Sequence, residues 1–276
     1  MRVNTGMFVM WCVLHIVPIL DVRAQNEQQA EEICAALESA KFSEVANESL
    51  KNLQNLIDGG YWDKLQQTRK EKIVDAFVKQ LRRGKRICQV GESEDAFNYL
   101  GYLGNIAGKL KNRKTIPILI DGLPCSVYAD ALAKMGDIPV SSLIEASEKG
   151  SHGTKNSVLH IFKKMQELKT VSEKNRERIK KAITRACRDN DEQIRLYAVA
   201  TLESYADESD VALLKELAES DSQYYEVNTS SGPWTGYGRH KRYIVREEAQ
   251  KTLTEIEKRK AGQSNTQPLQ KSTTTQ

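Results

Sequence analysis

The sequence predicts an all-α fold in which short helices pair into antiparallel hairpins. Apolar residues recur at intervals of three and four along most of the chain, as on helices with one buried face. Clusters of glycine, proline and aspartate interrupt this pattern, and the helices between them run roughly 10 to 20 residues. No stretch of Val, Ile or Thr alternates with polar residues over the length of a strand. Short helices with short links favour antiparallel pairs.

The composition is that of a globular protein. The 276 residues are enough for one or two domains, and 28% charged with 39% hydrophobic residues argues against a wholly disordered chain. Lys and Arg number 41 and Asp and Glu 37, a balance that gives no support to nucleic-acid binding. We therefore expect no nucleic-acid partner.

The first 24 residues predict a secretory signal peptide. Arg2 precedes the apolar run at residues 7–20, and Val22 and Ala24 are small or modest residues before the expected cut. The run is shorter than the ~20 residues that span a bilayer, and no later segment is long and apolar enough. We expect an exported chain, periplasmic or secreted, with no stable membrane insertion after cleavage. An uncut signal that tethers the chain to a membrane is the alternative.

The rest of the chain divides into three predicted segments. Residues 25–90 predict an irregular N-terminal helical cap, in which Ile73 and Phe77 belong to the buried stripe of one helix. Residues 91–260 predict the main helical domain. Residues 261–276 are polar and rich in Thr and Gln, which predicts a disordered tail.

Related helical units recur within the main domain. The pattern V/I-R-x-x-A-x-x-T-L-x-x-apolar fits residues 194–205 and 245–256, with Ala198 and Ala249 at equivalent positions. Including three looser matches, the equivalent apolar positions lie at spacings of 29, 30, 40 and 51 residues: Leu103, Leu132, Phe162, Leu202 and Leu253. Spacings of ~30 to 47 residues are typical of stacked two-helix repeats.

Each unit is expected to pair a first helix with a second one. In the best unit, helical spacing predicts one buried stripe: Ile194, Tyr197, Ala198, Leu202 and Tyr205. A second helix is predicted after each of the first four units, at residues 116–123, 138–147, 175–188 and 209–220.

At these residues the chain resembles the HEAT-repeat family, best over residues 191–221 and 243–258. Ala198 and Ala249 match the family's small residue, which lets two helices approach closely. The family's recurring Asp and Arg, which tie neighbouring turns together, are matched by three residues: Asp191, Arg195 and Arg246.

The resemblance implies an α-solenoid of antiparallel helical hairpins with a concave binding face. With the signal peptide, it implies a secreted bacterial protein with a HEAT-repeat domain. The chain departs from the family in its uneven repeat spacing, and Tyr128 replaces the small Ala of one unit. An irregular helical bundle is the alternative fold.

The sequence contains no catalytic or metal-binding motif. After the signal the histidines are His152, His160 and His240, without the H-E-x-x-H spacing of metalloproteases. The run 189–191 opens like a calcium loop, but Ile194 stands where the sharp turn needs Gly, so we interpret it as a capped turn between helices. We expect no enzyme, cofactor or metal. A HEAT-like lyase or glycosylase is the enzymatic alternative.

Four cysteines follow the signal peptide, namely Cys34, Cys88, Cys125 and Cys187. Export permits disulfides, and four cysteines allow three pairings, among which the sequence does not choose. The chain is long enough to build a core without disulfides, which favours buried free thiols.

An insertion at residues 221–242 lengthens one repeat connection and carries aromatic and basic residues. Such residues in a loop on a rigid scaffold are typical of binding hot spots. We predict that five of them contact a partner: Tyr225, Trp234, Tyr237, Arg239 and Arg242. The alternative is that the aromatic side chains fold back over the last helical hairpin.

The run KQLRRGKR at residues 79–86 carries five basic residues. It could meet an acidic partner or an anionic membrane surface. We favour the interpretation that it is the basic C-terminus of a helix that ends at Gly84.

These observations predict a monomeric, non-catalytic exported scaffold. It would bind a partner protein through its concave helical face and the 221–242 loop. A structural or membrane-tethered envelope protein is the alternative.

Overall fold

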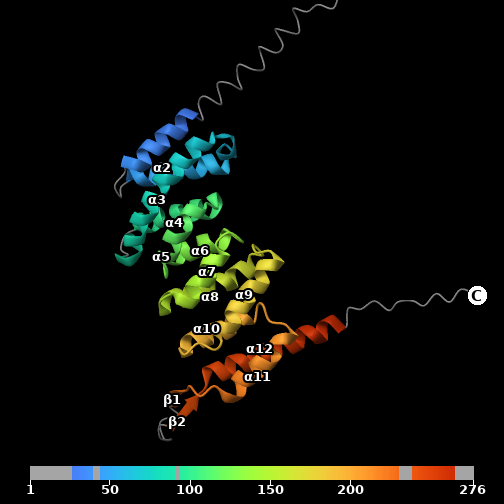
Figure 1. Cartoon of the computed structure of the whole chain (residues 1–276). Helices are drawn as coiled ribbons and strands as arrows, with labels where there is room; N and C mark the ends of the chain where they lie inside the picture. The colour runs from blue at the N-terminus through green and yellow to red at the C-terminus, as the bar shows by residue number, and fades with distance from the viewer. Residues whose placement is uncertain (1–26, 40–43, 91–93, 230–237, 265–276) are drawn as a thin grey trace, which may run out of the picture. The chain divides into compact units, whose positions relative to one another are not determined.

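The computed structural model describes residues 27–39, 44–90, 94–229 and 238–264, and it confirms the predicted helical fold (Figure 1). The helices pack into two compact units, one ending at Pro139 and the other beginning at Val140. The predicted signal peptide lies outside the described residues. No helix of the described part is long and apolar enough to cross a membrane.

The N-terminal unit is helical throughout its described residues. A helix at residues 27–39 is followed by α2 (Glu44–Asp58), η1 (Trp62–Lys64), α3 (Gln67–Val90), α4 (Glu94–Leu110), η2 (Arg113–Thr115), α5 (Ile116–Asp121) and α6 (Ser126–Lys134). Helix α4 packs against α2, α3 and α6. The predicted stripe of α3 is buried, including Ile73 and Phe77, because one face of this helix covers the core.

Helix α3 does not end at Gly84, as the sequence had suggested, but continues to Val90. A Cβ at Gly84 would run into the Leu103 side chain and lie 2.6 Å from the Tyr128 hydroxyl. That hydroxyl donates a 2.7 Å hydrogen bond to the carbonyl of Leu81. Gly84 is therefore a site of close side-chain approach rather than a helix stop, and Tyr128 fits because the glycine leaves room for it.

Cys88 near the end of α3 and Cys125 before α6 form a disulfide, with their Cα atoms 6.0 Å apart. The expectation of free buried thiols is therefore wrong for this pair. The expectation holds for Cys187, which is buried and free, whereas Cys34 is free and only partly buried. The disulfide links the end of α3 to the connection between α5 and α6.

The C-terminal unit contains the remaining helices and one β-hairpin. Its elements are α7 (Val140–Lys149), α8 (His152–Glu167), α9 (Glu173–Ala186), α10 (Glu192–Leu202), η3 (Glu208–Asp210), α11 (Val211–Ser220), β1 (Tyr225–Thr229), β2 (Gly238–Arg242) and α12 (Ile244–Ser264). Helix α7 packs against α8, α9 against α10, and α11 against α12. Helix α10 also packs against both α8 and α12.

The equivalent apolar positions proposed for the repeats are all buried: Leu103, Leu132, Phe162, Leu202 and Leu253. Ala198 and Ala249 are fully buried, as close helix packing requires. The prediction was wrong for Tyr197, whose side chain is 51% exposed. Ile194, Ala198 and Leu202 already fill the buried face of α10, and Tyr197 lies at its edge.

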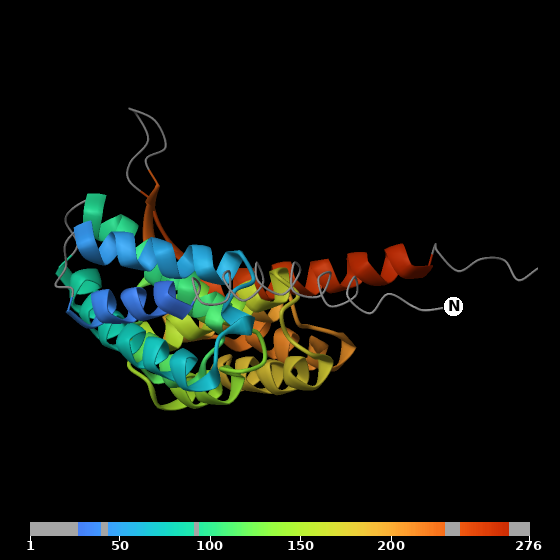
Figure 2. The same cartoon turned by 90° about the horizontal axis from the view of Figure 1, so that it is seen from above.

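The insertion at 221–242 is not simply a loop, because both of its arms form strands. Tyr225 of β1 pairs with Arg242 of β2, and the antiparallel register runs to Thr229 opposite Gly238. In Figures 1 and 2 the two strands extend away from the helices of the C-terminal unit. Each strand has five residues. β1 alternates Tyr225, Val227 and Thr229 with polar residues, so the expectation that no stretch alternates over the length of a strand is wrong there, whereas β2 is polar throughout.

Helix α12 extends to Ser264, four residues into the segment predicted as a disordered tail. The rest of that tail, residues 265–276, lies outside the described residues.

Candidate interaction surface

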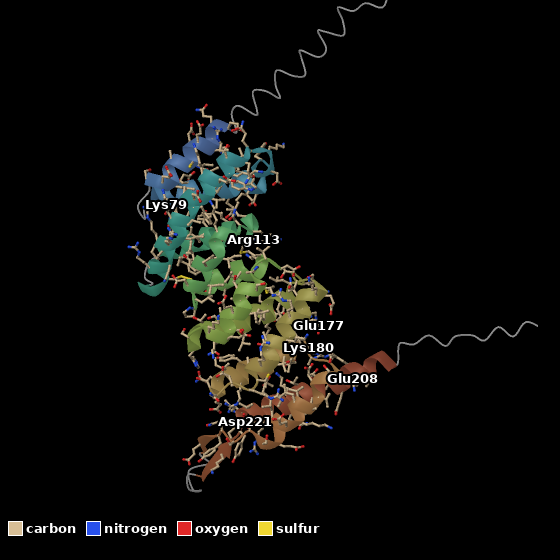
Figure 3. All side chains as sticks on the ribbon, in the orientation of Figure 1. Lys79, Arg113, Glu177, Lys180, Glu208 and Asp221 are labelled. Atoms are coloured by element: carbon tan, nitrogen blue, oxygen red, sulfur yellow. A yellow bond between two sulfur atoms is a disulfide. The ribbon has the colours of Figure 1, made fainter. Side chains whose placement is uncertain are left out.

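The β-hairpin is attached to the helical scaffold through Asp221, which caps the end of α11 and is 8% exposed (Figure 3). Arg195 of α10 donates to its carboxylate from Nε at 2.7 Å and from Nη2 at 3.1 Å. The hydrogen bonds to Asp221 raise the pKa of Arg195. Arg246 of α12 donates from Nε to the backbone carbonyl of Asp221 at 2.6 Å. Two helices therefore fix the residue from which the hairpin begins.

Aromatic rings and cations alternate next to this attachment. The ring of Tyr224, just before β1, lies 5.7 Å from that of Tyr243, just after β2. Lys241 Nζ lies 4.0 Å from the centre of the Tyr224 ring, and the Arg246 guanidinium lies 4.2 Å from that of Tyr243. These are cation–π distances. We call Asp221, Tyr224, Lys241, Tyr243 and Arg246 the hairpin base.

The hairpin base exposes an aromatic ring, that of Tyr224, whose position is fixed by its neighbours. The side chain of Tyr224 is 41% exposed although Lys241 and Tyr243 flank it. An aromatic ring that is already fixed loses little conformational entropy on binding, and it offers both apolar area and a hydroxyl. This arrangement suits protein recognition.

The structure describes only part of the predicted site. Tyr225 and Arg242 are paired residues of β1 and β2, and Arg239 pairs with Asn228. The guanidinium of Arg242 binds the carboxylate of Glu247 through Nε, at 2.9 Å to Oε2 and 3.2 Å to Oε1. The remaining two predicted residues, Trp234 and Tyr237, lie outside the described residues.

Sequence reasoning missed three members of the hairpin base as contact residues. Tyr224 and Lys241 lie in the insertion but are not among the five residues predicted to contact a partner, and Tyr243 begins the segment 243–258 that resembles a helical repeat. The two tyrosines share a signal, because residues just outside two paired strands lie side by side. Lys241 lies within β2, opposite Glu226, and has no such signal.

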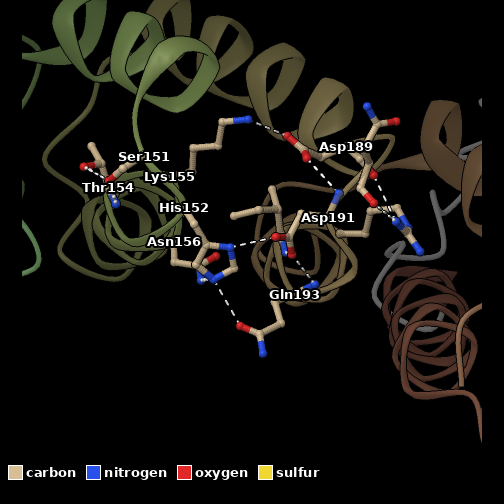
Figure 4. A network of polar contacts seen from close by, with 11 residues as sticks. Ser151, His152, Thr154, Lys155, Asn156, Asp189, Asp191 and Gln193 are labelled. Carbon is tan, nitrogen blue, oxygen red and sulfur yellow. Dashed lines mark hydrogen bonds and ion pairs between the residues drawn. The ribbon is translucent and has the colours of Figure 1, made fainter. Parts of the chain in front are cut away.

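A second polar network joins the start of α8 to the turn before α10 (Figure 4). Asp191 caps α10 by accepting from the backbone of Gln193 at 2.8 Å and of Ile194 at 3.3 Å. Its other oxygen lies 2.8 Å from Nδ1 of His152. Although desolvation opposes it, hydrogen bonding from His152 and these backbone groups lowers the pKa of Asp191. The interpretation of this turn as a helix cap is confirmed.

The same turn is fixed from two further sides. Lys155 of α8 forms a 2.7 Å ion pair with Asp189, and Arg195 donates to the carbonyl of Asp189 at 3.0 Å. Arg195 thus connects this turn with Asp221 and the hairpin base.

The histidine of this network is engaged at both ring nitrogens. Nε2 of His152 lies 3.0 Å from the amide nitrogen of Asn156 and 3.1 Å from Oε1 of Gln193. None of its contacts in the described part of the chain is a Ser, Thr or Cys side chain that could act as a nucleophile. The arrangement holds the start of α8 to the turn before α10.

The N-terminal unit contains a pocket of about 360 Å³ beside the free Cys34. Desolvation and the nearby Glu38 raise the pKa of the Cys34 thiol, which disfavours the reactive thiolate. The pocket lining mixes charges of both signs with small apolar residues: Ala30, Glu31, Cys34, Ala35, Glu38, Gln66, Thr68, Arg69 and Lys72.

Among residues 27–39, 44–90, 94–229 and 238–264, no three His, Cys, Asp or Glu side chains lie close enough to hold a metal ion together. No protein-family model matches the sequence, and no curated protein matches it significantly. The choice of the hairpin base as the candidate interaction surface therefore depends on its geometry alone.

Proposed function

We propose that this chain is an exported, non-catalytic scaffold of HEAT-like helical hairpins that binds a partner protein through its β1–β2 hairpin. The observation that carries the proposal is the hairpin base, where Arg195 and Arg246 fix Asp221 while Tyr224 stays exposed. A hairpin whose base is fixed by ion pairs and hydrogen bonds to a rigid scaffold is typical of a binding element rather than of a connecting loop.

Helix packing in the C-terminal unit supports a solenoid of hairpins. The pairs α7–α8, α9–α10 and α11–α12 are each in contact, so each predicted second helix packs against the first helix of the next unit rather than mainly against the one before it. The first helices α8, α10 and α12 contact one another in that order. Neighbour-to-neighbour packing of paired helices is what a stacked repeat predicts. The buried Ala198 and Ala249 lie where the family's small residue stands.

The disulfide Cys88–Cys125 supports export. Such bonds persist in oxidising compartments and are rare where thiols are kept reduced. This agrees with the signal peptide predicted at residues 1–24.

The hairpin supplies two kinds of contact. Tyr224, with the predicted Trp234 and Tyr237, would give desolvated aromatic area. Arg239 and Arg242 would give planar, charge-assisted hydrogen bonds, with Arg242 leaving Glu247 for a carboxylate of the partner.

Affinity capture from the native host tests the proposal. The chain from Gln25 onward is compared with a variant in which residues 226–240 are replaced by Gly-Ser-Gly. This variant keeps Asp221 and Tyr224, and the closing residues Tyr225 and Arg242 already face each other. We expect a specific protein to be retained by the first and lost by the second. Equal retention, or no specific protein with either, would overturn the proposal.

A further inference from the structure

Helix α9 carries a row of cations along its exposed face. Lys174, Arg178, Lys181 and Arg185 are all exposed and follow one another at spacings of four, three and four residues. Such spacing aligns side chains along one side of a helix, here over about 16 Å. We call these four residues the α9 row. Arg188, just beyond the helix, is also exposed.

Helix stability explains only one member of this row, Arg185, which lies in the last turn of α9 where the helix dipole favours a cation. Lys174 lies in the first turn of α9, where the helix dipole opposes a cation. Lys174 with Arg178, and Lys181 with Arg185, are like charges at i and i+4, which destabilise a helix. The neighbouring Lys180 shows the contrasting case, because it is buried and paired with Asp207 and Asp210 at 2.6 and 2.9 Å. Figure 3 labels Lys180 and Glu177 on this helix.

Most of the charge in the row is not neutralised by nearby acids. Arg178 donates to neutral acceptors, Asn175 Oδ1 at 2.8 Å and Ser141 Oγ at 2.9 Å. Lys174 and Lys181 form no ion pair with a described residue. Glu177 is the one exposed acid of α9 between Lys174 and Arg185.

One end of the row already holds a carboxylate. Arg185 reaches Glu148 of α7 from Nη2 at 2.5 Å, with both side chains largely exposed. This is a contact through a single nitrogen, so the guanidinium keeps donors for a second carboxylate. Its energy in water is small, and a partner can displace it.

We propose that the α9 row binds an acidic helix of a polypeptide whose carboxylates repeat at three- and four-residue spacing. That spacing on a second helix reproduces the spacing of the cations, and the arginines suit carboxylates by their forked geometry. The inference rests on the proposed function in that the partner is a protein, and it names the chemistry of a second contact. It uses no residue of the β1–β2 hairpin.

The probe is a synthetic helical peptide of three Glu-Ala-Ala-Glu-Ala-Ala-Ala repeats, titrated into the chain from Gln25 onward by calorimetry. The test variant is K174Q/R178Q/K181Q. Its matched control is K251Q/K258Q/K260Q, which removes the same charge from exposed positions of α12. A charge-retaining variant, K174R/K181R, checks that the cations and not the lysines as such are needed.

We expect the test variant to bind the peptide roughly tenfold more weakly, because three exposed ion pairs together account for about that factor. The matched control and the charge-retaining variant should bind like the parent chain. The test variant should unfold at a similar temperature, because the like-charge repulsion that it loses offsets the two hydrogen bonds of Arg178.

Heparin is titrated in the same way as a second probe. Three outcomes would overturn the inference: no binding of the peptide by the parent chain, an equal loss of peptide binding in the matched control, or a test variant that loses heparin binding but keeps peptide binding. The last would assign the row to an anionic glycan. The shortened-hairpin variant, in which residues 226–240 are replaced, should still bind the peptide. Failure of the hairpin to capture a partner is therefore distinguishable from failure of the α9 row to bind the peptide.

Discussion

Arg195 and Asp221, 26 residues apart, form a two-point ion pair that joins α10 to the segment leading into the β-hairpin. The Arg195 side chain is 12% exposed and that of Asp221 is 4% exposed. Arg195 also donates to the carbonyls of Asp189 and Asn190, at 3.0 and 3.1 Å. One side chain thus organises both the turn before α10 and the attachment of the hairpin.

Replacing Arg195 with Ala should destabilise the chain by about 3 kcal/mol, because Asp221 would remain buried without its cation. Arg195→Lys should cost less, since a lysine keeps the charge but not the fork. Urea denaturation measures both. The control is Arg185→Ala, which removes an exposed ion pair and should cost less than about 1 kcal/mol. An equal loss of unfolding free energy in Arg195→Ala and in the control would contradict the claim that buried Asp221 depends on Arg195.

Gly84→Ala should destabilise the N-terminal unit by roughly 1 to 3 kcal/mol even though Ala favours helices, because its methyl group would collide with Leu103 and Tyr128. Gly101 of α4 is the matched control, since a Cβ there meets no atom within 4 Å. Gly101→Ala should stabilise the chain by about 0.5 to 1 kcal/mol. The two changes should therefore differ in sign in thermal unfolding, and a stabilising Gly84→Ala would show that the contact is misplaced.

The stability conferred by Asp207 should depend on pH. Hydrogen bonds from Lys180 and Ser209 hold the pKa of this carboxyl well below its usual range. A lowered folded-state pKa gives stability that is present above the unfolded pKa of about 3.9 and is lost as the pH falls through the folded pKa. Since the Asp207 side chain is 56% exposed, we expect only about 1 kcal/mol.

The measurement compares the parent chain with Asp207→Asn in urea from pH 7 down to pH 2. The parent should be more stable at pH 7, and the difference should shrink below pH ~4, where Asp207 takes up a proton in the unfolded chain before it does so in the folded one. Glu257→Gln, at an exposed position of α12, controls for the loss of one charge. A difference that stays constant down to pH 2 would exclude the ion pair as its source.

Replacing Cys88 and Cys125 with Ser should lower the stability of the unreduced chain by roughly 3 to 4 kcal/mol, because their disulfide closes a 37-residue separation. Chemical denaturation under non-reducing conditions measures this. The Cys34→Ser chain is the control and should be nearly unchanged, since Cys34 is free and partly exposed. No loss in the double variant would mean that the bond does not form in solution.

Thiol labelling gives an independent result on the same cysteines. In the native, unreduced chain from Gln25 onward, Cys34 should react slowly, because burial and Glu38 raise its pKa. Cys187 should react only on unfolding, because burial raises its pKa to about 12. Rapid labelling of Cys88 or Cys125 would be inconsistent with the disulfide.

The fold was predictable to the extent that it depends on local pattern. Helical spacing of apolar residues located the helices, and Ala198 and Ala249 mark close packing that the structure shows. Gly84 shows where local reasoning fails. A glycine after a basic run has the local features of a helix end, but here it is required by the side chain of Tyr128, 44 residues later.

The candidate site was predictable in place but not in form. Aromatic and basic residues in the insertion indicated an interaction surface, and Arg242 is at the edge of the hairpin base. The strands were missed because the alternation in β1 covers only five residues, β2 is polar throughout, and strands this short are stable only as a pair. The disulfide was missed because cysteine count does not select a pairing, whereas the fold brings Cys88 and Cys125 together.

The central claim is that the β1–β2 hairpin and the exposed ring of Tyr224 at its base together bind the partner protein. The most direct test is the affinity of the captured partner for Tyr224→Ala compared with Tyr197→Ala. Both are exposed tyrosines of the C-terminal unit, at 41% and 51%, but only Tyr224 belongs to the hairpin base. We predict that Tyr224→Ala weakens binding at least about tenfold, as for a hot-spot residue, and that Tyr197→Ala leaves it unchanged. Unchanged affinity for Tyr224→Ala, or an equal loss for Tyr197→Ala, would contradict the claim.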